Sequence, residues 1–124
     1  MIYKLRTSAE TQKVFAKVGQ TSGLQPFILS KIAIALSIRQ GSLHDEDFNT
    51  DTSGLELNRQ TIFGEHDLMF RCLISCNEGK SLSEDEYFPR LVKAHLDRGA
   101  RILGGEARYS KNLYTNLCQL DSNI

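Results

Sequence analysis

The sequence predicts a mainly α-helical fold in which a short N-terminal strand is followed by a helical bundle. Three observations support this prediction. Polar and apolar residues alternate over residues 1–7, two helix patterns follow one another up to residue 41, and helical spacing of apolar residues returns after residue 65. A chain of 124 residues has the usual size of one domain. We therefore expect a single domain over residues 1–124, with a strand-helix-helix unit (1–41), an acidic loop with a short strand (42–64) and C-terminal helices (65–124).

The first seven residues show the period of two that a strand requires. Tyr3 and Leu5 point to one side of the expected strand, whereas Ile2, Lys4 and Arg6 point to the other. Lys4 and Arg6 are therefore expected to share one face.

The first helix is expected to begin at Thr7 and to end near Gly23. Thr7 and Glu10 have the spacing of a capping box, in which the Thr7 hydroxyl accepts a hydrogen bond from a first-turn amide and the Glu10 side chain accepts one from the amide of the cap residue. An apolar stripe is formed by Val14, Phe15 and Val18. The opposite side carries Glu10, Lys13, Lys17 and Gln20.

The second helix is expected to begin at Pro26 and to end before Gly41, because proline suits a first helical turn and glycine suits the position after the end. Residues 27–38 contain nine apolar side chains. Such a helix must be enclosed on every side, and it is too short to cross a membrane. The simplest enclosure is a second copy of the chain, so we expect a homo-oligomer. The alternative is the central core helix of a monomer.

The strand-helix-helix order resembles a ribbon-helix-helix unit, in which strand residues read DNA and helices hold its phosphates. The net charge is zero but uneven: residues 1–41 carry +5, residues 42–86 carry −8 and residues 87–124 carry +3. A locally basic face can attract a polyanion even on a neutral protein. The alternative is a set of ordinary solvated faces. The candidate DNA-binding residues are Lys4 and Arg6, expected in the major groove of DNA, and Lys13, Lys17 and Lys31, expected to contact the phosphate backbone of DNA.

The remaining elements are an acidic loop over residues 42–54, a short strand over residues 55–58 and at least two helices. The first of these helices runs from Glu65 to Gly79, with inward positions expected at Leu68, Met69, Cys72, Leu73 and Cys76. A capping box at Ser83 precedes Pro89, so either a turn leads to a helix that begins at Pro89 or one helix bends there. We expect Gly104-Gly105 to end that helix, with a possible final helix from residue 106.

Catalytic and metal-binding patterns find little support in this sequence. Residues 45–56 match a calcium-binding EF-hand loop at five positions, but Thr50 replaces the glycine of its turn. Cys72 and Cys76 are more simply read as buried small apolar residues than as metal ligands. The three histidines are scattered, and no nucleophile or nucleotide-binding motif is present. We expect no enzyme, cofactor or metal. Three cysteines without disulfide spacing and an N-terminus without a signal peptide indicate the cytoplasm.

The whole chain resembles the DndE family of bacterial DNA phosphorothioation systems. The resemblance is carried by the segment IYKLRTSAETQKVFAKVGQTSGLQPFILSKIAIALSIRQG, by the acidic middle loop and by HLDRGARILGG. It implies a small, mostly helical DNA-binding protein that prefers nicked duplex DNA and forms a homotetramer. The resemblance also implies that it acts beside a cysteine desulfurase, DndC and DndD, and that these partners perform the sulfur chemistry. A ribbon-helix-helix repressor, a protein scaffold of the modification complex and a metal-dependent enzyme are the alternatives.

Overall fold

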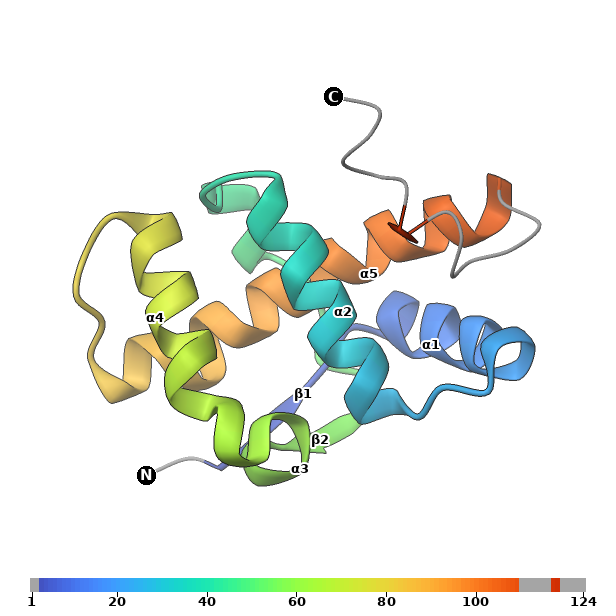
Figure 1. The fold of residues 1–124 in the computed structure, drawn as a ribbon, viewed down its shortest axis with the longest axis horizontal. Coiled ribbons are helices and arrows are strands. Elements are labelled where there is room, and N and C mark those ends of the chain that lie inside the picture. The colour runs from blue at the N-terminus through green and yellow to red at the C-terminus, as the bar shows by residue number, and fades with distance from the viewer. Residues whose placement is uncertain (1–2, 110–116, 119–124) are drawn as a thin grey trace.

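The computed structural model describes residues 3–109 and 117–118, and it confirms a mainly helical fold with a short N-terminal strand (Figure 1). The strands β1 (Lys4–Arg6) and β2 (Glu56–Asn58) form an antiparallel pair in which Leu5 lies opposite Leu57. The main helices are α1 (Ala9–Ser22), α2 (Pro26–Arg39), α4 (Asp67–Glu78) and α5 (Val92–Tyr109). Shorter helical turns are η1 (Asp45–Phe48), α3 (Arg59–Phe63), η2 (Gly64–His66) and η3 (Glu86–Leu91).

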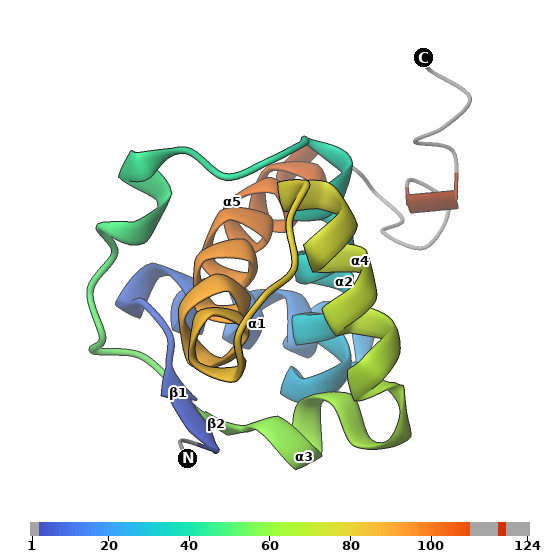
Figure 2. The same cartoon turned by 90° about the vertical axis from the view of Figure 1, so that its left-hand side faces the viewer.

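The central element is α5, which packs against both α2 and α1 (Figures 1 and 2). Its buried side chains include Val92, Leu96, Ala100 and Leu103. The glycine pair at 104 and 105 was predicted to end this helix, and that prediction was wrong. Helix α5 continues to Tyr109, and the site of a Cβ on Gly104 lies only 3.1 Å from Val14 of α1. The packing of α5 against α1 therefore overrides the low helix propensity of glycine. The possible final helix lies mostly outside the described residues.

The start of α1 differs by one residue from the prediction. Ser8, not Thr7, is the N-terminal cap, and its hydroxyl accepts a hydrogen bond from the Thr11 amide. Thr7 is buried, and its hydroxyl oxygen accepts a hydrogen bond from the Leu55 amide at 2.9 Å. The hydroxyl of Thr7 is thus used to join β1 to the segment before β2. The predicted helix end is confirmed, since Gly23 follows α1 with a φ of 76°.

The orientation of α4 corrects a prediction. The predicted inward positions Leu68, Met69, Cys72, Leu73 and Cys76 are all exposed, and the helix buries Phe70 and Ile74 instead. Phe70 contacts Phe63, with 4.9 Å between the ring centroids. The helix carries two apolar stripes, and periodicity alone does not say which of them meets the core. The stripe of Phe70 and Ile74 packs inward, so α4 presents its other apolar stripe to solvent.

Helix α2 also differs from the expectation of complete enclosure. Leu29, Ala33, Ile34 and Leu36 are buried, whereas Ile28 and Ile32 are only partly buried and Ala35 is exposed. One side of α2 is therefore core, and the other side is incompletely covered by its own chain. Within residues 3–109, no single helix is long and apolar enough to span a membrane; α1 and α2 together reach the required length and composition, but they are bent by 111°.

The connection before α5 follows the first of the two predicted alternatives, a turn rather than a bent helix. Phe88 has extended backbone angles (φ −128°, ψ 125°), and α5 begins at Val92 after the Phe88–Pro89 peptide bond, which is cis. The predicted end of α4 is confirmed by Gly79, which has a φ of 72°.

Candidate nucleic-acid interface

Strand β1 holds Lys4 and Arg6 on its outer face, as the alternation of residues predicts. Leu5, between them, is 4% exposed and packs into the core, whereas the two basic side chains are exposed. The strand partner comes from the same chain, with Arg6 opposite Glu56. In a ribbon-helix-helix dimer, this strand pairs with the same strand of a second copy. Here β1 pairs with β2 of its own chain instead.

Helix α1 holds Lys13 and Lys17 one turn apart on its exposed side. Phe15 and Val18 are each 2% exposed and fix the opposite side of the helix in the core. Because residues four positions apart lie above one another on a helix, the two ammonium groups belong to one surface. Helix α1 thus presents two positive charges on its solvent-facing side.

Lys31 lies apart from the other candidates. It belongs to α2, is only half-exposed, and its ammonium nitrogen lies 5.7 Å from the centroid of the Phe27 ring. The five predicted residues therefore lie on three elements, as one pair on β1, one pair on α1 and a single residue on α2 (Figure 1). The structure keeps each pair together and does not gather all five into one cluster.

The five candidates differ from several basic side chains of the C-terminal part in their partners. In the C-terminal part, Arg59 pairs with Asp67 and Glu84 at 2.7 Å each, Lys80 pairs with Glu86 and Lys93 pairs with Asp97. Within residues 3–109, no ion pair involves the five candidates Lys4, Arg6, Lys13, Lys17 and Lys31. The N-terminal cations are therefore available to an external anion, whereas these C-terminal cations are already compensated.

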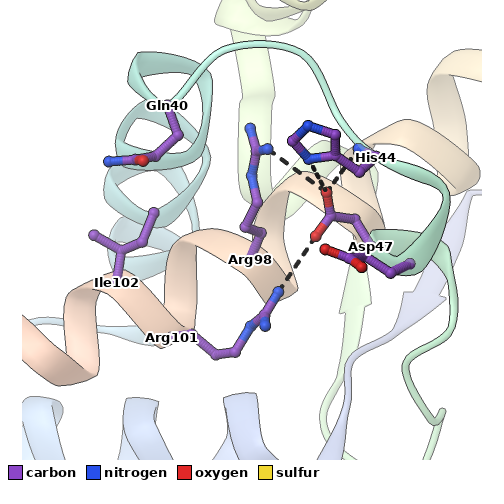
Figure 3. Close-up of a pocket in the computed structure, with 7 residues that line it drawn as sticks. Gln40, His44, Asp47, Arg98, Arg101 and Ile102 are labelled. Carbon is purple, nitrogen blue, oxygen red and sulfur yellow. Dashed lines mark hydrogen bonds and ion pairs between the residues drawn. The ribbon is translucent and has the colours of Figure 1, made fainter.

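A pocket of about 410 Å³ lies where the end of α2, η1 and α5 meet (Figure 3). Figure 3 shows the Asp47 carboxylate facing three basic side chains, with distances of 3.6 Å to Arg98, 3.4 Å to Arg101 and 3.8 Å to His44. Asp47 is only 5% exposed. Its negative charge offsets the arginines, so the pocket is not an open anion site. Its polar groups join the loop over η1 to α5.

Arg98 holds the end of α2 against α5. Its Nη2 donates to the carbonyl oxygens of Ser37 and Gly41 at 2.6 Å each, and its Nε donates to the Ser37 hydroxyl at 2.8 Å. Its Nη1 donates to the Ser42 carbonyl at 3.1 Å. Carbonyl groups at a helix C-terminus lack partners within the helix, and a guanidinium with five donors satisfies several of them at once. The donors of Arg98 are thus used within the chain, where they hold the end of α2 and the residues after it.

His95 is fully buried beside Arg98. Its Nδ1 lies 2.8 Å from the Ser37 hydroxyl oxygen, and its Nε2 lies 3.4 Å from Glu78 without a hydrogen-bond partner among the described residues. Burial, together with the positive charge of Arg98, lowers the pKa of His95 to about 4. This histidine is therefore neutral at physiological pH and provides no charge for DNA.

A second buried polar cluster joins the acidic loop to the start of α1. Asp97 is 2% exposed and accepts hydrogen bonds from the Thr11 hydroxyl at 2.7 Å, the Thr50 hydroxyl at 2.7 Å and the Lys93 ammonium at 2.6 Å. The Ala9 amide donates to Asp51 at 2.9 Å, and this bond is the main cause that lowers the pKa of that carboxyl group.

Neither buried cluster was predicted from the sequence. Their signal was the run His95-Leu96-Asp97-Arg98, in which three polar residues fall inside a helix with buried apolar neighbours. In the acidic loop, Asp47 is buried beside Arg98, whereas Asp51 is exposed and accepts a hydrogen bond from the Ala9 amide. Among the described residues, no group of three side chains is placed to hold a metal ion. Cys72 and Cys76 were expected to be buried and are exposed.

The comparisons with known proteins decide the family. The family model described as DNA sulphur modification protein DndE matches residues 4–111. The chain belongs to the DndE family. A crystal structure of DndE from Escherichia coli B7A, described as involved in DNA phosphorothioation modification, has a TM-score of 0.66 and 19% sequence identity. The match covers 83% of this chain and 97% of that one.

A second solved structure is a glycine-to-lysine mutant of DndE involved in DNA phosphorothioation, with a TM-score of 0.64 and 17% identity. The match covers 82% of this chain and 97% of that one. These two likenesses show the DndE fold. No curated protein matches the sequence. The family expected from the sequence is therefore confirmed, and it connects the chain to DNA phosphorothioation.

Proposed function

We propose that this chain is a DNA-binding accessory component of DNA phosphorothioation. It binds duplex DNA, with a preference for nicked duplex, through Lys4, Arg6, Lys13, Lys17 and Lys31. It acts in the cytoplasm as a homotetramer beside DndC- and DndD-type proteins, without a catalytic step, cofactor or metal of its own. Membership of the DndE family supports the connection to the DNA backbone.

The observation that carries the proposal is the division of the basic side chains. Lys4, Arg6, Lys13 and Lys17 are exposed and form no ion pair with a described residue, whereas Arg59, Lys80, Lys93 and Arg98 of the C-terminal part are held by carboxylates. Exposed cations without partners can neutralise phosphates and release the counterions of DNA, which is the main source of sequence-independent affinity. Lys31, half-buried against Phe27, is the least accessible candidate.

The proposal is tested by fluorescence anisotropy with an intact duplex and a centrally nicked duplex of one random sequence. The variant with Lys13→Ala and Lys17→Ala should bind both duplexes more weakly. Its slope of log affinity against log salt should fall by about 0.9 for each lysine that contacts a phosphate. Lys80→Ala is the matched control, because Lys80 is an exposed lysine already paired with Glu86 at 3.0 Å. The control should leave affinity and slope unchanged.

Each outcome of this titration has a distinct meaning. Tighter, salt-dependent binding to the nicked duplex supports the proposal, and equal binding to both duplexes removes the preference for a nick. In a separate selection from random sequences, binding to one intact operator far above random DNA would favour the ribbon-helix-helix repressor. An absence of binding to either duplex would overturn the DNA-binding role and favour the scaffold, for which the exposed apolar surface of α4 is the relevant observation.

A further inference from the structure

A second pocket, of about 270 Å³, lies beside the N-terminal end of β1. Its lining residues come from the start of β1, from α3, from the first turn of α4 and from the segment before η3; they are Tyr3, Arg59, Gln60, Asp67 and Glu84. Strands β1 and β2 and helix α3 lie together at one end of the molecule (Figures 1 and 2). The volume equals that of about nine molecules of liquid water, which leaves room for one planar ring system. This site is here called the Tyr3 pocket.

The walls of the Tyr3 pocket are held in place by contacts within the chain. Arg59 donates through Nε and Nη2 to the two carboxylate oxygens of Asp67 at 2.9 and 2.7 Å, and through Nη1 to Glu84 at 2.7 Å. Its guanidinium carbon lies 5.0 Å from the centroid of the Tyr87 ring. The Arg59 amide donates to the Tyr3 carbonyl at 2.7 Å, which ties the backbone of Tyr3 to the same residue. The chain therefore forms this pocket without help from a ligand.

The charges around the Tyr3 pocket compensate one another. Two carboxylates, Asp67 and Glu84, pair with two guanidinium groups, because Arg71 also pairs with Glu84. The hydrogen bonds from Arg59 are the main cause that lowers the pKa of both carboxyl groups, so both act as hydrogen-bond acceptors only. The Asp67 and Glu84 side chains are 30% and 41% exposed, so part of this acceptor capacity faces solvent. These four charges sum to zero, which suits an uncharged polar ligand better than a phosphate or a metal ion.

The uncharged groups of the Tyr3 pocket narrow the class of ligand. The Tyr3 side chain is 56% exposed, and its ring offers a flat surface on which a base can stack. Gln60 is exposed and brings an amide with both donor and acceptor atoms. Proteins bind an unstacked base with this combination, an aromatic face together with polar groups at the edge of the base. The carboxylates also discriminate between bases, because adenine, cytosine and guanine carry an amino group that can donate to them, whereas thymine does not.

We propose that the Tyr3 pocket binds one unpaired nucleobase and prefers adenine, cytosine or guanine to thymine. This inference rests on the proposed function, in which Lys4 and Arg6 of the same strand hold DNA. Tyr3 directly precedes Lys4, and consecutive side chains of a strand point to opposite sides. A DNA strand would therefore place a phosphate at Lys4 and a base at Tyr3, on the two sides of β1. An unpaired base beside a nick supplies this ligand, because it leaves the stack at a lower cost than a paired base.

The first test changes the protein and the DNA together and measures binding by fluorescence anisotropy. One nicked duplex carries an unpaired adenine at the strand end beside the nick, and the other carries an abasic site at that position. Tyr3→Ala should bind the adenine duplex about fivefold or more weakly, which is the lower end of the effect of one base stacked on an aromatic ring. It should bind the abasic duplex as the unchanged chain does. Tyr3→Phe keeps the ring and should bind both duplexes normally.

Two outcomes of the first test would overturn the proposal. An equal loss of affinity for both duplexes would mean that Tyr3 acts on DNA without contacting the base, and no loss for either would mean that the pocket takes no base. The slope of log affinity against log salt should stay unchanged in Tyr3→Ala, because no phosphate contact is removed. Circular dichroism spectra confirm that both variants are folded.

The second test concerns the identity of the base. A nicked duplex with an unpaired thymine should bind about fivefold or more weakly than the same duplex with adenine or cytosine. Gln60→Ala leaves the ion pairs of Arg59 intact and should weaken binding of the adenine duplex but not of the abasic duplex. Gln40→Ala is the matched control, because Gln40 is an exposed glutamine at the end of α2, in the other pocket. Equal binding of thymine would contradict the proposal, since the carboxylates would then receive no amino group.

Free deoxyadenosine separates the two possible sources of the base and the two proposals. If the chain binds neither duplex, but deoxyadenosine shifts the amide resonances of Tyr3 and Gln60, the base pocket is retained and the DNA-binding proposal is lost. If the lysine variants lower the affinity and the salt slope while the base has no effect, DNA binding is retained and the base pocket is lost. A chain that binds neither the duplexes nor deoxyadenosine loses both.

Discussion

The close approach of α5 to α2 at Gly99 makes the most direct prediction about the fold. A Cβ built on Gly99 of α5 would lie 1.7 Å from the carbonyl oxygen of Ala33 and 2.3 Å from its carbonyl carbon. Contacts below 3.0 Å essentially never occur for real Cβ atoms, so this oxygen would have to move from 1.7 Å to at least 3.0 Å away. The obstructing atoms belong to the backbone of α2 and cannot rotate aside. Gly99→Ala should therefore force apart the two helices that form the core.

The expected magnitude follows from two opposing contributions. Overpacking of a core costs about 1 to 3 kcal/mol and occasionally more, whereas alanine gains about 1 kcal/mol over glycine inside a helix. Since the contact is with backbone, we take the upper end of the cost and expect a net loss of about 2 kcal/mol or more in the free energy of unfolding. Urea unfolding followed by circular dichroism measures this loss.

Gly105 of the same helix provides a matched control. A Cβ at this position meets no described atom within 4 Å, so Gly105→Ala should raise the free energy of unfolding by up to about 1 kcal/mol. If Gly99→Ala is as stable as the unchanged chain while Gly105→Ala gains stability, the close packing of α5 on α2 is refuted.

Two further predictions concern the buried polar groups. The pKa of His95 is about 4 in the folded chain against 6.5 ordinarily, so the unfolded chain takes up this proton first as the pH falls. The contribution of His95 to the free energy of unfolding is complete above pH 6.5 and should decline by about 3 kcal/mol as the pH falls to 4. Urea titrations at several pH values should show a smaller decline of the free energy of unfolding in the variant His95→Gln. An equal decline in the variant would exclude His95 as the cause. Asp97→Ala should cost about 3 kcal/mol, because it leaves the Lys93 ammonium and two hydroxyl groups without their acceptor. Adding Lys93→Ala should recover part of that loss in thermal unfolding, whereas strictly additive losses would show that the pair does not interact.

The sequence was a good guide to local structure. The alternation around Leu5, the proline at the start of α2 and the glycines after α1, α2 and α4 each act within a few residues, so their effects are visible in the chain. The same is true of the exposure of Lys13 and Lys17, which follows from the buried stripe of α1.

What could not be predicted depends on contacts between distant residues. Helix α4 has two apolar stripes, and only the position of Phe63 and the other core groups decides that Phe70 turns inward. The persistence of α5 through two glycines depends on its contact with α1, where Gly104 lies against Val14, 90 positions earlier in the chain. The partners of Asp97 and Arg98 come from separate segments, so their burial had no local signature beyond polar residues in an apolar helix.

The central place of α5 has a consequence for the order of folding. The helices α1 and α2 pack mainly on α5, which begins only at Val92, and β1 pairs with β2, which begins at Glu56. Contacts between segments so far apart must close long loops before they gain stabilising energy. During synthesis, α1 and α2 leave the ribosome well before their packing partner. The core is therefore expected to form late, once most of the chain has been made, rather than from the N-terminus onward.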